Sequence, residues 1–278
     1  MFARTGNDYL KQFNEKRLNG ELLVGFAVDT VKTARCCENA GADFLILYSP
    51  GQFRSQGRGF LTGYLAYSDA NKIIIETGAE ILPMIRKTPV FAGICGTDPF
   101  RLMSFYLKEL ADLGFPGVHN FPSVGLIDGK FRESLEDIGR GYALEVEMIR
   151  EAHNSSMITC PFVFNEEQAA GMTEAGADFL IIHPGLDIYE GNAAGEAETI
   201  RNLINRIRPI INTAKQHNSE IGILFFIESR QMVDNVSFLL EHVPEIDGFY
   251  VPAPPDIQIS DEKMGELTDE LKRFHTTR

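Results

Sequence analysis

The segment Ala40–Ile46 reads AGADFLI, and the same seven residues return at Ala175–Ile181. The two copies start 135 residues apart, at positions 40 and 175 of a chain of 278 residues. Each copy joins a polar stretch to an apolar run of strand length, with glycine where a helix would end and aspartate in the turn. The repeat therefore predicts a fold with two equivalent strands about half a chain apart.

Apolar runs of strand length continue on both sides of the two copies. They alternate with longer amphipathic stretches, and most are continuously apolar, as expected for strands buried on both faces of a parallel sheet. The eight predicted strands are Leu22–Val28, Phe44–Ser49, Pro89–Cys95, Gly117–Phe121, Met157–Val163, Phe179–His183, Ile221–Ile227 and Gly248–Val251.

Eight strands alternating with helices predict a protein of the α/β class, a single (β/α)8 TIM barrel. We assign residues 21–278 to the barrel and residues 1–20, which are mostly polar, to a short helical extension that closes one end. A doubly wound open sheet is the alternative fold. Such a sheet usually carries a glycine-rich phosphate loop after its first strand, whereas the first strand here runs into Asp29-Thr30.

The composition restricts the classes of partner. The chain has 26 basic and 39 acidic residues, a net charge of -13, which argues against nucleic acid or an anionic membrane and leaves room for a small anionic substrate. No apolar run reaches the roughly 18–20 residues that span a bilayer. The first residues lack the pattern of a secretory signal, and the four cysteines form no CxxC pair. We therefore expect a cytoplasmic protein.

Polar residues at the carboxyl ends of the strands are the candidates for chemistry, because active sites of β/α barrels lie there. His183 ends the sixth predicted strand and aligns, in the repeat, with Tyr48 at the end of the second. A histidine there suits a general base, a hydrogen-bond donor or a metal ligand, although a structural histidine fits equally well. Asp98 precedes a proline and would cap a helix over residues 99–113; a carboxylate there also suits Mg²⁺ binding or proton transfer. Asn120, polar within an apolar strand, needs either a ligand or a neighbouring side chain as its partner.

The longest connection follows the second strand and reads PGQFRSQGRGFLTGYLAY over residues 50–67. Connections longer than about 12–15 residues are commonly functional. Its glycines permit close approach of the backbone to a ligand, and Arg54 and Arg58 offer planar guanidinium groups that match a carboxylate or phosphate. The loop predicts an anion clamp at the barrel mouth. A surface loop whose arginines pair with nearby acids is the alternative.

Four stretches together resemble a known family: ILYSPGQFRSQGRGFLTGYLAYSDAN at 46–71, PVFAGICGTDPF at 89–100, residues 117–153, and residues 161–183. Over residues 20–255 the chain resembles the phosphoenolpyruvate hydrolase-like TIM-barrel family, related to the phosphoenolpyruvate mutase and isocitrate lyase superfamily. The resemblance implies a lyase or hydrolase acting on a 2-oxo acid, or on a phosphoenolpyruvate- or phosphonopyruvate-like anion, through an enolate-like intermediate. It also implies Mg²⁺ and a homo-oligomer; nothing in the sequence indicates a nucleotide or organic cofactor.

The resemblance also assigns roles to residues. Ser49 and Gly51 match the family's Ser-Gly pair, and the two arginines match its F-R-x-x-G-R-G motif. Asp98 or His183 would move the proton, and Asp98 is the candidate metal ligand. Together with Tyr48 from the repeat, the predicted site consists of catalytic Asp98 and His183 and of substrate-binding Tyr48, Ser49, Gly51, Arg54, Arg58 and Asn120.

Two segments depart from the family pattern. The family's G-T-G after strand one is Val28-Asp29-Thr30 here, and its C-H-G-G-P-like end of strand seven is Phe225–Ser229. The second change removes a histidine and two glycines and places Phe225 and Phe226 where they would narrow the pocket or change its substrate. These departures favour an alternative function: a barrel that binds a small anion for sensing, regulation or assembly, without turnover.

Overall fold

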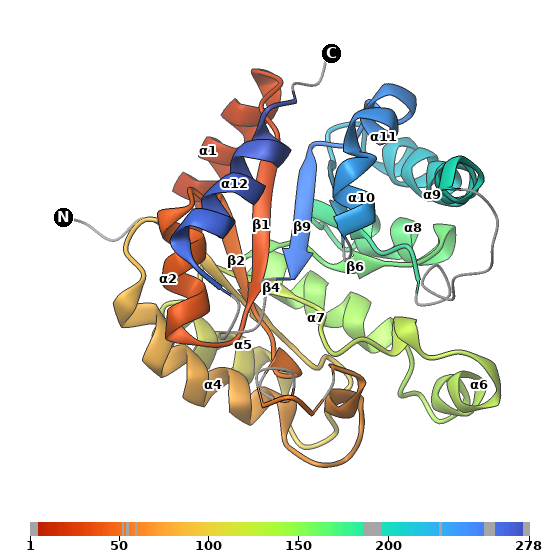
Figure 1. Cartoon of the computed structure of the whole chain (residues 1–278). Helices are drawn as coiled ribbons and strands as arrows, with labels where there is room; N and C mark the ends of the chain where they lie inside the picture. The colour runs from red at the N-terminus through yellow and green to blue at the C-terminus, as the bar shows by residue number, and fades with distance from the viewer. Residues whose placement is uncertain are drawn as a thin grey trace.

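The computed structural model describes residues 5–274, apart from residues 52, 54–55, 59, 186–195, 228–229 and 253–258. Strands and helices alternate, and the helices surround the sheet (Figure 1). The strands are β1 (Leu23–Val28), β2 (Phe44–Leu47), β3 (Val90–Gly93), β4 (Gly117–His119), β5 (Ile158–Thr159), β6 (Phe162–Val163), β7 (Phe179–Ile182), β8 (Gly222–Phe226) and β9 (Gly248–Pro252). The helices are α1 (Gly6–Leu18), α2 (Val31–Asn39), α4 (Ala70–Ile81), α5 (Met103–Leu113), α6 (Gly129–Asp137), α7 (Ala143–Asn154), α8 (Glu166–Glu174), α9 (Glu196–His217), α10 (Arg230–Asp234), α11 (Val236–His242) and α12 (Asp261–Lys272), with 3-10 turns at Phe60–Tyr64, Leu82–Met84 and Val124–Leu126.

The strands form a closed barrel. All pairs are parallel, in the order β5-β4-β3-β2-β1-β9-β8-β7-β6, and only Cys160-Pro161 separates β5 from β6. The hydrogen bonds continue across that break, since the Cys160 amide donates to the Val118 carbonyl (3.1 Å) and the Ile181 amide donates to the Pro161 carbonyl (2.8 Å). The predicted α/β barrel of eight strands is confirmed. The fifth strand is split at Pro161, which has no amide hydrogen for the ladder.

The aspartate of the repeat stabilises the amino end of the barrel. In each copy its carboxylate accepts a hydrogen bond from a backbone amide at the start of the neighbouring strand, a donor that would otherwise be buried without a partner. A third aspartate, outside the repeat, does the same at β9. The pairs are Val24 with Asp43 (2.8 Å), Thr159 with Asp178 (2.9 Å) and Ile223 with Asp247 (2.8 Å).

The phenylalanine of the repeat fills the same end. Phe44 lies over Gly25 of β1 and Phe179 lies over Gly222 of β8, so closely that a Cβ on either glycine would come within 2.1 Å of the ring. Phe13 of α1 packs edge-on against both rings, at centroid distances of 6.3 and 6.0 Å. The first helix therefore covers the amino end of the barrel, and the phenylalanine of each copy of the repeat packs beneath it.

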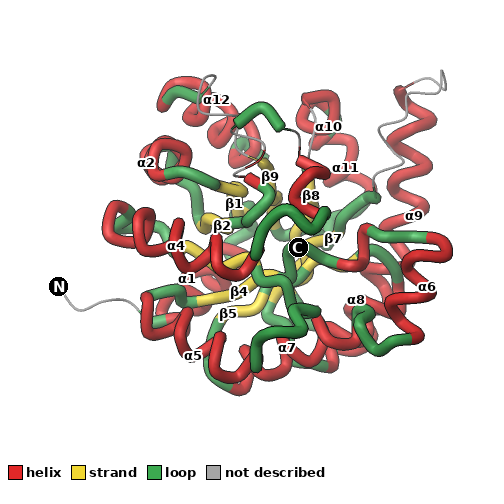
Figure 2. The backbone as a smooth tube through the Cα atoms, turned by 90° about the horizontal axis from the view of Figure 1, so that it is seen from below, coloured by secondary structure: helices red, strands yellow, loops and turns green. Residues whose placement is uncertain are grey.

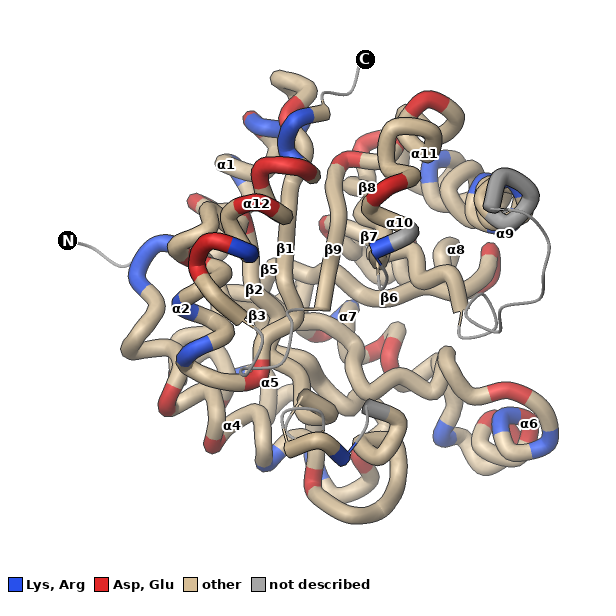
Figure 3. The backbone as a smooth tube through the Cα atoms, viewed as in Figure 1, with Lys and Arg blue, Asp and Glu red and all other residues tan. Residues whose placement is uncertain are grey.

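The barrel buries two apolar layers. One lies between strands and helices, and the other fills the interior, where it includes Tyr48, Phe121, Phe162 and Phe226. The strands carry no charged residue, and the charges visible in Figure 3 lie on helices and connections. In Figure 1 the arrowhead of β9 points down, so Figure 2, seen from below, looks onto the carboxyl ends of the strands. Within the described residues, no helix is both long enough and apolar enough to cross a membrane.

Candidate functional site

The loop after β2 carries three of the predicted site residues, Gly51, Arg54 and Arg58. Arg58 is exposed, and its backbone is fixed at both ends, by its amide to Phe53 (2.8 Å) and by its carbonyl to the Thr62 hydroxyl (2.7 Å). Arg54 lies outside the described residues. Gly51 lies against Asp29 at the end of β1, where a Cβ would come within 2.3 Å of the aspartate Cβ. Only glycine permits this approach, which joins the ends of β1 and β2.

Ser49 is a buried polar residue whose hydrogen-bonding capacity is unused. Its side chain is 2% exposed, and its hydroxyl oxygen has no hydrogen-bond partner within the described part of the chain. The neighbouring Tyr48 is also buried and packs edge-on against Phe121 at 5.9 Å. A buried hydroxyl without a partner is uncommon and is explained by a bound water or ligand. Ser49 therefore fits the predicted substrate-binding role, which stays a prediction.

His183 lies at the end of β7 and is held as a neutral hydrogen-bond donor. The backbone amide of Gly185 donates to its Nδ1 (3.0 Å), so the ring proton resides on Nε2. Burial lowers the pKa of His183 to about 3, with smaller contributions from His119 and Arg206. The Nε2–H group can donate to a substrate oxygen, whereas the nitrogen that could act as a base is already occupied.

Three phenyl rings surround His183. Phe226 is stacked on the imidazole at a centroid distance of 4.7 Å, Phe162 meets it edge-on at 4.9 Å, and Phe164 is tilted at 5.1 Å. The imidazole is 4% exposed. A donor in such dry surroundings interacts more strongly with a negatively charged oxygen than it would in water.

His119 is a second buried histidine, and sequence reasoning missed it. Its Nδ1 lies 2.7 Å from the Cys160 carbonyl, which can only accept, so the proton resides on Nδ1. Its Nε2 is an acceptor without a partner within the described residues. Burial lowers the pKa of His119 to about 4. It meets Phe162 edge-on at 4.4 Å and therefore lies next to His183 in the same aromatic layer.

Asp98 does not cap the following helix, so that prediction was wrong. The helix α5 begins only at Met103, with Leu102 at its N-cap, and a turn at residues 99–100 precedes it. Asp98 instead accepts hydrogen bonds from the Asn71 amide group (2.9 Å), the Arg101 guanidinium (2.5 Å) and the Phe100 backbone amide (2.9 Å). These bonds compete with the capping geometry and fix the connection after β3 against α4.

Asn120 is engaged by protein groups. Its amide donates to Glu145 (2.6 Å) and to the Phe162 carbonyl (3.3 Å), and its oxygen accepts from the Phe162 amide (2.6 Å). Of the two kinds of partner that the sequence left open, the structure shows neighbouring protein groups. The substrate-binding role of Asn120 stays a prediction.

Glu145 of α7 organises the connection that follows β4. The carboxylate is fully buried and also accepts from the Ser123 hydroxyl (2.7 Å) and the Val124 amide (2.8 Å). Burial raises the pKa of Glu145 to about 7, against the opposing effect of its three donors. A sequence signal existed, because Glu145 shares one helix face with Met148, Ile149 and Ala152, which are all buried.

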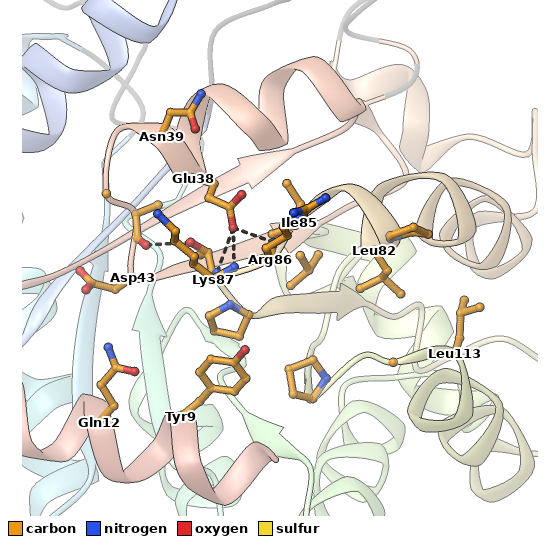
Figure 4. Close-up of a pocket in the computed structure, with 18 of the residues that line it drawn as sticks. Tyr9, Gln12, Glu38, Asn39, Asp43, Leu82, Ile85, Arg86, Lys87 and Leu113 are labelled. Carbon is orange, nitrogen blue, oxygen red and sulfur yellow. Dashed lines mark hydrogen bonds between the residues drawn. The ribbon is translucent and has the colours of Figure 1, made fainter. Parts of the chain in front are cut away.

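Two cavities lie at opposite ends of the barrel. At the carboxyl end, a cleft of about 530 Å³ is lined by Tyr64, Asp98, Arg101 and Ser123 among others. His183 is not among the described residues that line this cleft, although it lies at the same end of the barrel as Asp98. A cavity of about 990 Å³ lies at the amino end (Figure 4).

Several polar groups of the amino-end cavity are paired with other groups of the protein. Glu38 accepts from the backbone amides of three successive residues, at 2.9, 2.7 and 3.2 Å, which are drawn as dashed lines in Figure 4. The Thr88 hydroxyl donates to the Ala42 carbonyl (3.2 Å), and Asp43 pairs with Lys16 and Lys272. Glu38, Thr88 and Asp43 therefore serve the fold at this end of the barrel.

Mg²⁺, which the family resemblance implies, requires carboxylate oxygens that are available to coordinate it. Within the described ranges, no three His, Cys, Asp or Glu side chains lie close enough together to hold a metal ion. Both oxygens of Asp98 are occupied, one of them by the cationic guanidinium of Arg101. The guanidinium of Arg101 competes with a divalent cation for this carboxylate, so Asp98, as it is bonded here, does not fit the role of a Mg²⁺ ligand.

Comparisons with known proteins agree with the barrel fold of the chain. The sequence model of the phosphoenolpyruvate hydrolase-like family matches residues 8–273. Two proteins of Solanum lycopersicum, the ToMV susceptible protein tm-1(GCR26) and the ToMV resistance protein Tm-1(GCR237), are 37% and 36% identical over 241 residues, 87% of this chain. The match covers 32% of the length of each tomato protein, so the chain spans about a third of these relatives.

Among solved structures, a phosphonopyruvate hydrolase in complex with oxalate and Mg²⁺ is similar in fold. Its TM-score is 0.56 at 12% sequence identity, and the match covers 89% of this chain and 80% of that chain. At this identity the likeness shows a shared barrel and leaves the chemistry to the residues of the site.

Proposed function

Because this chain belongs to the phosphoenolpyruvate hydrolase-like family, we propose that it is an enzyme acting on a small 2-oxo acid, or a related anion, at the carboxyl end of the barrel. The reaction class is a lyase or hydrolase reaction, in which a bond next to the carbonyl carbon breaks or forms. The electron pair of that bond is carried by the carbonyl oxygen as an enolate, and the site must stabilise this negative charge.

The position and protonation of His183 are the main support for the proposal. Its Nδ1 accepts from Gly185 and its Nε2 holds the ring proton, so it offers a fixed neutral donor between apolar rings. Such a donor stabilises an enolate oxygen without first having to reorient. The buried hydroxyl of Ser49 is the second group that we assign to substrate, and exposed Arg58, with Arg54, is assigned to the carboxylate.

We assign no step to Mg²⁺ and none to Asp98. The solved relative binds oxalate and Mg²⁺, whereas Arg101 and Asn71 occupy the Asp98 carboxylate here. Turnover that is unchanged by EDTA is the expected result. Restoration of lost activity by Mg²⁺ alone would return the metal to the mechanism.

The test is a turnover assay by ¹H and ³¹P NMR with 2-oxo acids, phosphoenolpyruvate and phosphonopyruvate. His183→Phe should lower kcat/KM by about 10²–10³, as removal of one oxyanion donor does. His183→Gln, which keeps an N–H donor, should retain part of the activity. The matched control is His217→Gln on α9, an exposed histidine paired with Glu174 (3.0 Å), and it should leave turnover unchanged. Equal activity in wild type and His183→Phe would contradict the proposal.

A second function is favoured by Phe226. This residue occupies the barrel mouth where the family pattern has a smaller, polar segment, and the interior layer around it is buried. A barrel that binds a small anion for regulation, without turnover, would need no open reaction space. It predicts thermal stabilisation by a 2-oxo acid with no product formed, and steady product formation would exclude it.

A further inference from the structure

We propose that Phe226 sets the substrate class of this site, which takes a 2-oxo acid carrying a flat apolar group, such as an aryl 2-oxo acid, in preference to a compact phosphorylated one. The inference rests on the proposed function and narrows it. It assigns a specificity-determining role to a residue in the segment where this chain departs from the family pattern.

Of the two adjacent phenylalanines that end β8, only one faces the site. Side chains alternate along a strand, and Phe225 packs in the layer between strands and helices. Phe226 belongs to the interior layer and stacks on His183, with 22° between the ring planes. The donor that we assign to the reacting oxygen therefore lies directly against a phenyl face.

The remaining neighbours of His183 extend the apolar surface. Phe162 and Phe164 lie on the neighbouring strand and its end, and the Phe164 ring is only half-buried. Aromatic groups pair favourably at centroid distances of 4.5–7 Å. A flat group next to the reacting carbonyl can make such contacts, whereas a tetrahedral phosphate cannot.

The charges of the described residues favour a substrate with one anionic group over a substrate with two. His183 and His119 are neutral, and the guanidinium of Arg101 is bound by Asp98 and by both oxygens of Asp69 (3.0 and 2.9 Å). Exposed Arg58 is suited to a single carboxylate. A phosphate placed among phenyl rings would lose its hydration without compensating partners, which is costly.

Equilibrium binding of phenylpyruvate, 2-oxobutyrate and phosphoenolpyruvate to the full chain tests this inference. In the wild type, phenylpyruvate should bind at least tenfold more tightly than 2-oxobutyrate. Phe226→Ala and the bulkier Phe226→Leu should both reduce that ratio, and the second variant keeps the test valid if the first does not fold. The matched control is Phe131→Ala on α6, where the ring is 65% exposed, and it should preserve the ratio.

The outcomes separate the two proposals. If 2-oxobutyrate or phosphoenolpyruvate is bound as tightly as phenylpyruvate and is turned over, Phe226 does not set the class and only this inference fails. A preference for phenylpyruvate that survives in both Phe226 variants also overturns it. If no 2-oxo acid binds or is converted, the proposed function fails and this inference fails with it.

Discussion

The two ends of the barrel use polar residues in opposite ways. At the amino end, Asp43, Asp178 and Asp247 are buried or half-buried, and each accepts a backbone amide of the neighbouring strand. At the carboxyl end, the Ser49 hydroxyl and the Nε2 of His119 are buried without partners within the described residues. The difference teaches that these three carboxylates serve the fold at one end, while Ser49 and His119 retain hydrogen-bonding capacity for a ligand at the other, where β/α barrels carry their active sites.

Asp247→Ala should give the largest effect, at the amino end. Its carboxylate is almost fully buried, accepts from Ile223 and pairs with buried Arg17 at 3.1 Å. Removing one partner of a buried pair leaves an uncompensated charge and costs about 3–5 kcal/mol of unfolding free energy. Denaturant titration measures this loss. Asp112→Ala, which removes an exposed carboxylate paired with Lys108, should cost less than about 1 kcal/mol; equal losses would contradict the comparison.

Glu145→Gln should change how stability depends on pH. The pKa of Glu145 is raised to about 7 in the folded protein, so between pH 4.5 and 7 the folded state binds more protons than the unfolded state. This contribution to stability is present below pH 4.5 and is lost as the pH rises to 7. Relative to Glu145→Gln, the wild type should lose up to about 3 kcal/mol over that range. The exposed Glu147→Gln on the same helix is the control, and a flat difference at Glu145 would refute its raised pKa.

His183→Phe tests whether the His183 imidazole, at the carboxyl end, is neutral in the folded protein. Its effect on the pH dependence of stability should have the opposite sign to that of Glu145→Gln. The pKa of His183 is lowered to about 3, so below pH 6.5 the unfolded state takes up protons first and stability is lost as the pH falls. Between pH 6.5 and 5 the wild type should lose about 2 kcal/mol relative to the variant. Urea unfolding at the two pH values provides the measurement, and the His217→Gln control, which retains His183, should lose stability on acidification as the wild type does.

Ser49→Ala should have the smallest effect on stability and a clear effect on binding. Removal of a buried hydroxyl that has no partner among the described residues leaves the unfolding free energy unchanged or raises it by up to about 1 kcal/mol. Affinity for a 2-oxo acid should fall in the same variant. The control Ser123→Ala removes a hydroxyl bound to Glu145 and should cost about 1–3 kcal/mol. A similar loss in both variants would show that Ser49 serves the fold.

The strands could be predicted from the sequence because the chemistry that fixes them is local. Continuous apolar runs mark strands buried on both faces, and the AGADFLI repeat located two equivalent helix-to-strand turns. What the sequence could not show is which partners the repeat serves. Val24 lies 19 residues before Asp43, and Thr159 lies 19 residues before Asp178, so these hydrogen bonds exist only once the strands are paired.

The site was predicted less completely, because its groups come from separate elements. Asp98 has the local pattern of a helix cap, but Asn71 and Arg101 compete for its oxygens. His119 lies beside Asn120 in an apolar strand, and its inward direction follows only from the barrel. Arg54 lies outside the described residues, so the anion clamp stays a prediction.

The most direct test of the account is a ¹H–¹⁵N NMR titration of the His183 imidazole, with and without a 2-oxo acid. We expect a neutral ring with its proton on Nε2 from pH 5 to 8, and a shift of the Nε2 signal when the ligand is added. The signals of His217, at the far end of the barrel, should not shift on binding. Titration of His183 near pH 6.5, or ligand binding that leaves its Nε2 signal unchanged, would contradict the assignment of this histidine to the substrate.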